Sequence, residues 1–120
     1  MLIPYVNHFT MNDKEHFLAV TLDGGHNIIQ THVVSVGTVN RTLLHPREVF
    51  TEAIREKASA IILCHNHPSG NTDPSEEDID TTENLVEVSQ IVGIPILDHI
   101  IISRNGYFSF LEHKLLKPVR

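Results

Sequence analysis

A wholly apolar run, residues 60–64, ends directly before His65. A run this short and this apolar predicts a β-strand that is buried on both faces. Helical patterns stand on both sides of it. Residues 46–58 begin with a proline, a favoured first-turn residue, and place their apolar side chains on one helix face. Residues 75–92 predict a second helix, which Gly93 is placed to cap. Its predicted inward stripe comprises Ile79, Thr82, Leu85, Val86, Val88, Ser89 and Val92.

Both ends of the chain predict β-hairpins, because paired segments rich in apolar and β-branched residues flank turn-forming clusters. The segments are His16–Leu22, Ile28–Val36, Ile96–Ser103 and 108–111, and the turns are residues 23–27 and 105–106. The predicted order is therefore β, β, α, β, α, β, β. This order indicates an α/β or α+β fold in which helices flank a mixed sheet, with ligands at the carboxyl end of a strand.

Size and composition restrict the classes of function. At 120 residues, 41% of them hydrophobic, the chain suits one domain spanning residues 1–120. A net charge of -6 is poorly suited to a phosphate backbone, so we expect no direct nucleic-acid partner. The single cysteine, Cys64, excludes an internal disulfide and cysteine-rich zinc sites. Residues 1–10 lack a secretory pattern, and no stretch has the ~20 apolar residues of a membrane span, so a cytoplasmic protein is expected.

A run of polar residues after the buried strand has the spacing of a metal site. His65 and His67 are two apart, so on an extended segment their imidazoles point to one face. Asp78 follows eleven residues after His67, near the start of the second helix. Two imidazoles and a carboxylate form a three-ligand set that leaves the fourth position of zinc open to water. These residues predict a catalytic zinc site, and hence hydrolysis.

Simpler interpretations of the same residues stay open. Ser75 and Asp78 also match a capping box, which would not prevent the carboxylate from reaching an ion held by the histidines. Strand alternation turns Cys64 away from His65, so we expect it in the core. Five of the nine histidines receive no role: His8, His16, His26, His32 and His113. For His45 and His99, which border apolar elements, a structural role is favoured.

The segments HNHPSG (65–70) and PSEED (74–78) resemble the signature of the RadC-like branch of the JAB1/MPN/Mov34 metalloenzymes. That signature is a glutamate, then His, any residue, His, seven residues, Ser, two residues and Asp. Segments 35–40, 44–50 and 97–103 resemble the same proteins. The resemblance implies a JAB/MPN domain with a curved mixed sheet flanked by helices, similar in architecture to cytidine deaminases, and a bound zinc ion. Deaminase chemistry is excluded, since it takes two thiolates and Cys64 is alone.

The resemblance also implies roles for individual residues. The metal ligands and the active-site serine fall on His65, His67, Asp78 and Ser75. The upstream glutamate best matches Glu15, directly before the first strand, with Glu48 and Glu52 as fallback candidates. Asn66 stands where deubiquitinating members usually have Ser or Thr, so ubiquitin is not the expected substrate. The helix-hairpin-helix segment of full-length relatives is expected to be absent from this chain.

The implied activity is zinc-dependent hydrolysis of an amide bond in a peptide or protein substrate. Glu15 is expected to move the proton between water and the leaving amine, and Ser75 to donate a hydrogen bond to the oxyanion. Asp73 or Asp98 would orient the histidines. The alternatives are a nuclease-like DNA-processing or DNA-repair-associated role and a non-catalytic interaction module. Exposed sheet edges also suggest a homodimer.

Overall fold

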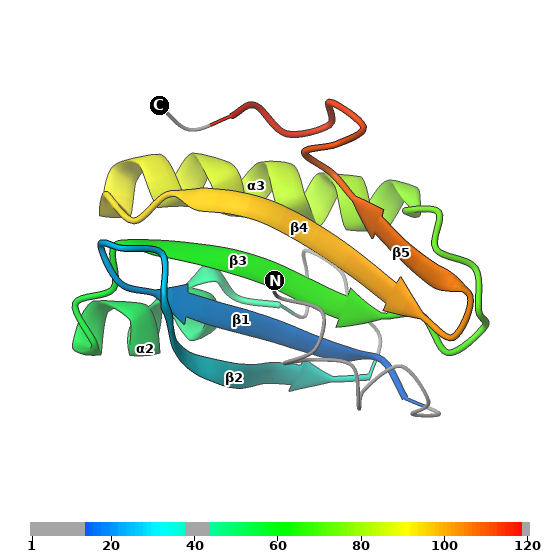
Figure 1. Ribbon diagram of the computed structural model, residues 1–120, viewed down its shortest axis with the longest axis horizontal. Coiled ribbons are helices and arrows are strands. Elements are labelled where there is room, and N and C mark those ends of the chain that lie inside the picture. Colours follow the sequence, from blue (N-terminus) through cyan, green and yellow to red (C-terminus); the bar gives the residue numbers. More distant parts are fainter. Residues whose placement is uncertain (1–13, 38–43, 119–120) are drawn as a thin grey trace.

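The computed structural model describes residues 14–37 and 44–118, which contain seven regular elements. They are β1 (His16–Leu22), β2 (Ile28–Val36), α2 (Pro46–Arg55), β3 (Ala60–Asn66), α3 (Glu76–Val92), β4 (Ile96–Ser103) and β5 (Gly106–Ser109). The strands form one sheet in the order β2-β1-β3-β4-β5 (Figure 1). β3 and β4 run parallel and the other neighbours antiparallel, so the predicted mixed sheet with helices is confirmed. Within these ranges, no helix is long and apolar enough to cross a membrane.

Element boundaries differ from the predicted ones where backbone turns intervene. α2 ends at Arg55 rather than at residue 58, because Lys57 adopts a left-handed conformation with φ of 55°. The β4–β5 turn is shifted by one residue, and Gly106 opens β5 with φ of 133° instead of lying in the turn. β5 stops at Ser109, since the Leu111 amide donates to Asp98 Oδ1 at 3.0 Å and so leaves the sheet.

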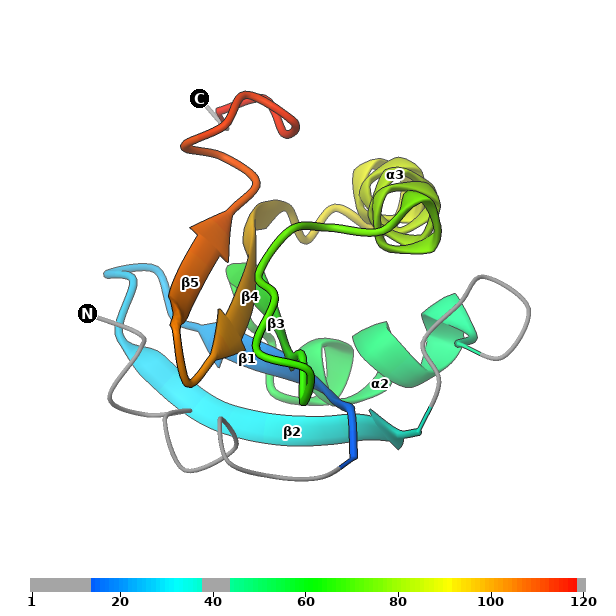
Figure 2. The same cartoon turned by 90° about the vertical axis from the view of Figure 1, so that its right-hand side faces the viewer.

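Both helices lie on the same side of the curved sheet (Figure 2). α2 and α3 cover one sheet face, where a buried cluster includes Phe17, Val49, Phe50, Leu63, Leu85 and Ile101. The opposite face holds a second cluster that contains Leu18, Val20, Cys64, Ile100 and Ile102. Cys64 is buried there, as predicted, and burial raises the pKa of its thiol to about 12. The sheet therefore separates this thiol from the helix-covered face.

The buried face of α3 is more polar than its sequence pattern indicated. Its buried residues are Asp78, Thr81, Thr82, Leu85 and Ser89. Val92, predicted to point inward, is 36% exposed because it is the last helical residue before the left-handed Gly93. Four of the five buried residues are polar, which indicates that this face does more than pack against the sheet.

Thr81→Val is expected to raise the free energy of unfolding by about 1 kcal/mol. The Thr81 hydroxyl is buried and has no hydrogen-bond partner among the described residues. An unpaired buried polar group costs about 1–3 kcal/mol, and valine has nearly the same shape and helix propensity as threonine. Urea unfolding at an unchanged m-value measures the shift in midpoint. A lower midpoint would mean that this hydroxyl is paired.

Candidate metal centre

His65 and His67 come from the carboxyl end of β3, the central strand of the sheet. The register pairs His65 with Phe17 of β1 and with Ile101 of β4, so the strand is held from both sides. The Nε2 atoms of His65 and His67 lie 2.9 Å apart, and both side chains are buried. The predicted convergence of the two imidazoles on one point is therefore present in the structure.

Asp78 reaches the same point from the first turn of α3. Its Oδ1 lies 3.2 Å from His65 Nε2, and its Oδ2 lies 3.2 Å from His67 Nε2. The capping box is also formed: the Ser75 amide donates to Asp78 Oδ2 at 2.8 Å, and the Asp78 amide donates to Ser75 Oγ at 3.0 Å. The capping box thus leaves the carboxylate beside the histidines, and the role of Asp78 as a metal ligand stays a prediction.

Glu15 is the glutamate that the fold brings to this point. Its Oε1 lies 4.0 Å from His67 Nε2, and one atom each of Glu15, His65 and His67 fall within 4.8 Å of one another. The fallback candidates lie on α2, where Glu52 forms an exposed pair with Arg55 at 3.2 Å and Glu48 is exposed in the first turn. Its position therefore favours Glu15 over Glu48 and Glu52 as the glutamate of the site. The acid-base role of Glu15 stays a prediction.

Electrostatics hold Asp78 ionised. Burial by itself would raise the pKa of Asp78, but its contacts with His65 and His67 outweigh burial and hold that pKa well below the usual range. Burial by itself would lower the pKa of His67. Its contacts with Asp78 and with the Asn71 carbonyl outweigh burial, so the pKa of His67 is raised overall. A negative carboxylate and two imidazoles in so small a space favour a cation, which is either a proton or a metal ion.

The donor set fits a metal ion. His67 Nδ1 lies 2.7 Å from the carbonyl oxygen of Asn71, which can only accept, so Nδ1 carries the proton and neutral His67 aims a lone pair from Nε2 at the site. Ligands about 2.0 Å from a tetrahedral zinc ion lie about 3.3 Å apart. The observed separations of 2.9 and 3.2 Å are close to that value. His65, His67 and Asp78 would therefore hold zinc with little movement.

The residues that orient the two imidazoles differ from those predicted. His65 Nδ1 lies 2.8 Å from Nε2 of His99, which is completely buried, and burial drives the pKa of His99 well below its ordinary value. Asp98 instead accepts from Ser109 Oγ at 2.6 Å, and Asp73 is exposed. A structural role was favoured for His99; its position on the strand predicted after the second helix was the signal that could have found it.

Asn66, between the two histidines, points to the start of β1. Its Nδ2 donates to the Lys14 carbonyl at 2.9 Å, and its Oδ1 accepts from the His16 amide at 2.5 Å. These two bonds flank Glu15 in the chain. The completely buried Asn66 thus fixes the backbone from which Glu15 reaches the site, a role that sequence analysis missed.

The loop between β3 and α3 is clamped by the β4–β5 turn. Arg104 donates to the carbonyls of Pro68 and Ser69 at 2.8 and 3.1 Å, and Asn105 Nδ2 donates to that of Gly70 at 2.9 Å. Gly70 has φ of 89°, a left-handed conformation that favours glycine, and a Cβ there would lie 2.7 Å from Asn105 Nδ2 and displace that side chain. The clamp shapes one wall of the groove beside the site.

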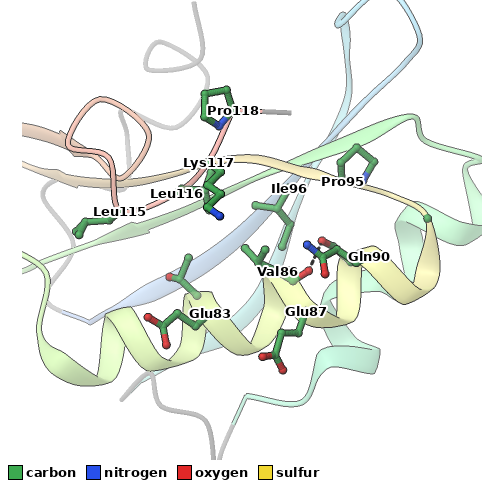
Figure 3. Close-up of a pocket in the computed structure, with 13 residues that line it drawn as sticks. Glu83, Val86, Glu87, Gln90, Pro95, Ile96, Leu115, Leu116, Lys117 and Pro118 are labelled. Atoms are coloured by element: carbon green, nitrogen blue, oxygen red, sulfur yellow. Dashed lines mark hydrogen bonds between the residues drawn. The ribbon is translucent and has the colours of Figure 1, made fainter. Parts of the chain in front are cut away.

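That groove has a volume of about 650 Å³ and opens onto His67. Its lining includes Lys14, Glu15, His67, Ser69 and Ser75. A larger groove of about 850 Å³ lies between α3 and residues 115–118, and its lining includes Val86, Ile96 and Leu116 (Figure 3). None of the predicted ligands lines the larger groove, so we place the chemistry in the smaller one.

A mixed sheet with helices on one side, two histidines at the end of its central strand and an aspartate from the next helix define a domain of the JAB/MPN class. The sequence model described as RadC-like JAB domain matches residues 2–115. The chain belongs to the RadC-like JAB domain family.

Relatives agree with this assignment. A "UPF0758 protein" of Alkaliphilus oremlandii is 52% identical over 104 residues, which cover 87% of this chain and 45% of the relative. Another of the same name, from Pelobacter propionicus, is 48% identical over 111 residues, covering 91% and 48%. The chain thus spans about half the length of these curated relatives. Their printed name describes no activity.

Proposed function

We propose that this domain is a zinc-dependent hydrolase of the JAMM type that cleaves an amide bond in a peptide or protein. The observation that carries the proposal is the convergence of His65, His67 and Asp78 beside an open groove. Their contacting atoms lie 2.9 to 3.2 Å apart, and Glu15 stands at the edge of the same groove. Family membership supports the fold and this chemistry class, since JAB domains include hydrolases.

A zinc ion in such a site supplies Lewis-acid activation of water. Glu15 would take the proton of the attacking water and return it to the leaving nitrogen; its partly exposed side chain at the groove, 4.0 Å from His67, supports this role. Ser75 Oγ accepts the Asp78 amide, and this bond does not use the hydroxyl proton. That proton is available to a developing oxyanion in the groove.

Metal content and hydrolysis test the proposal together. Elemental analysis of the purified chain is expected to find about one zinc per molecule, and His67→Ala is expected to remove it. A peptide library followed by mass spectrometry should show cleavage that a chelator abolishes and zinc restores. A folded protein that binds no zinc would overturn the proposal and favour an interaction module. Zinc-dependent cleavage of oligonucleotides but not peptides would favour the DNA-processing alternative.

Zinc affinity is expected to fall as the pH is lowered, because the ion must displace the proton that His67 binds with a raised pKa. If one proton is displaced, the apparent Kd increases about tenfold for each pH unit below that pKa and levels off above it. Competition with a chromophoric chelator at a series of pH values measures the slope. A Kd that does not change across this range would show that His67 gives up no proton to the metal.

A further inference from the structure

We infer that Thr82 and His99 are positioning residues which decide that the imidazole proton of His65 sits on Nδ1, so that Nε2 faces the metal centre as a lone pair. The inference rests on the proposed function, because it concerns one ligand of the same site. Thr82 and His99 do not touch the predicted metal position themselves. They act through a buried series of hydrogen bonds whose direction the structure determines.

A backbone carbonyl determines which atom donates in each hydrogen bond of the series. Thr82 Oγ1 lies 2.7 Å from the carbonyl oxygen of Asp78, one helical turn earlier in α3. A carbonyl oxygen can only accept, so the single hydroxyl proton of Thr82 is used there. Thr82 Oγ1 also lies 2.5 Å from His99 Nδ1. With its proton committed, Thr82 must accept in this second contact, and His99 Nδ1 must carry the proton.

The protonation of His99 then determines that of His65. His99 is completely buried, and its two ring nitrogens contact the Thr82 hydroxyl and His65 rather than a carboxylate, so nothing compensates a charge on the ring and it is neutral. A neutral imidazole with its proton on Nδ1 has a bare Nε2, which can only accept. His65 Nδ1 lies 2.8 Å from that atom and must donate to it. The proton of His65 is thereby held on Nδ1, and Nε2 is left free for a metal.

The opposite direction conflicts with the geometry. If Thr82 donated to His99, its oxygen and the Asp78 carbonyl oxygen would stand 2.7 Å apart with no proton between them. Two buried acceptors placed together without a proton between them are costly. The reversed series would also put the proton of His65 on Nε2, where it could no longer bind a metal.

Aromatic neighbours keep both rings in place. Phe17 stacks on His65 with ring centroids 5.8 Å apart and an interplanar angle of 19°. Phe110 stacks on His99 at 4.6 Å and 12°. Both phenyl rings are buried, so neither imidazole can turn over without displacing the core. Asp78 contacts both the first and the last residue of the series. Its backbone carbonyl accepts from Thr82, and its carboxylate lies 3.2 Å from His65 Nε2.

Two measurements test the inference, neither of which depends on hydrolysis. Nitrogen-15 NMR of the histidine rings in the metal-free protein is expected to show both His65 and His99 protonated on Nδ1, with Nε2 of His99 bare. Zinc affinity, measured by competition with a chromophoric chelator, is expected to fall about 10–100-fold in Thr82→Val. Thr82→Ser, which keeps the hydroxyl, should bind like wild type. Thr81→Val is the matched control, because it removes a buried hydroxyl from the adjacent residue without touching His99.

A wild-type spectrum with the proton of His65 or His99 on Nε2 would overturn the inference, whatever the variants do. So would Thr82→Val with unchanged zinc affinity. If Thr82→Val does not fold, the position of the protons in the wild-type spectrum still decides. Wild-type protein that shows the expected protonation but binds no zinc would support the hydrogen-bond series and overturn the proposed function, so the two failures are distinguishable.

Discussion

Replacing Glu15 with glutamine is expected to lower kcat/KM for amide hydrolysis by about 10²–10⁴, the usual contribution of a positioned acid-base group. Glutamine has nearly the same shape but neither accepts nor returns a proton. The zinc content should stay near that of wild type, because Glu15 Oε1 lies 4.0 Å from His67 Nε2, whereas Asp78 lies 3.2 Å from each histidine. Kinetics with a cleavable peptide and elemental analysis on the same sample measure both quantities.

Glu52→Gln is the matched control, because it removes a glutamate that pairs with Arg55 on α2. Its activity should equal that of wild type. Loss of zinc in Glu15→Gln would show that Glu15 is itself a ligand, as its grouping with His65 and His67 also permits. Full activity in Glu15→Gln would remove Glu15 from the mechanism.

Asp78→Asn is expected to weaken zinc binding by more than the about 10–100-fold typical of a residue that only orients a ligand. Asparagine keeps an oxygen that can accept from the Ser75 amide, now at 2.8 Å from Asp78 Oδ2, so the helix cap is largely preserved. The negative charge that the two imidazoles and the ion require is lost. Chelator competition gives the affinity, and thermal unfolding of the chelated proteins reports the cap separately.

Asp80→Asn provides the comparison, since Asp80 is an exposed carboxylate two residues further along α3. It changes the net charge equally and should leave the Kd for zinc unchanged. Equal losses in both variants would indicate general electrostatics instead of direct ligation. Wild-type affinity in Asp78→Asn would remove Asp78 from the ligand set and leave Glu15, His65 and His67 as the remaining group.

Local patterns predicted most of the fold because they act over short stretches of chain. The richness in apolar and β-branched residues on both sides of the turn cluster at 23–27 predicted β1 and β2, and the uniform apolarity of 60–64 predicted β3. Errors arose where a local backbone choice ended an element, as at Lys57 and Gly106. Val92 was misplaced because helical periodicity does not report that the last residue before the left-handed Gly93 is exposed.

The sequence by itself determined the donor types of the candidate site, since the spacing of His65, His67 and Asp78 depends only on the geometry of a strand end and a helix start. Only the tertiary structure decided what surrounds them. It placed Glu15 by means of Asn66 and set His99 beside His65, pairs that are separated by about fifty and thirty-four residues. Such contacts follow from sheet order and register, which depend on the packing of the whole core. No local pattern contains that information.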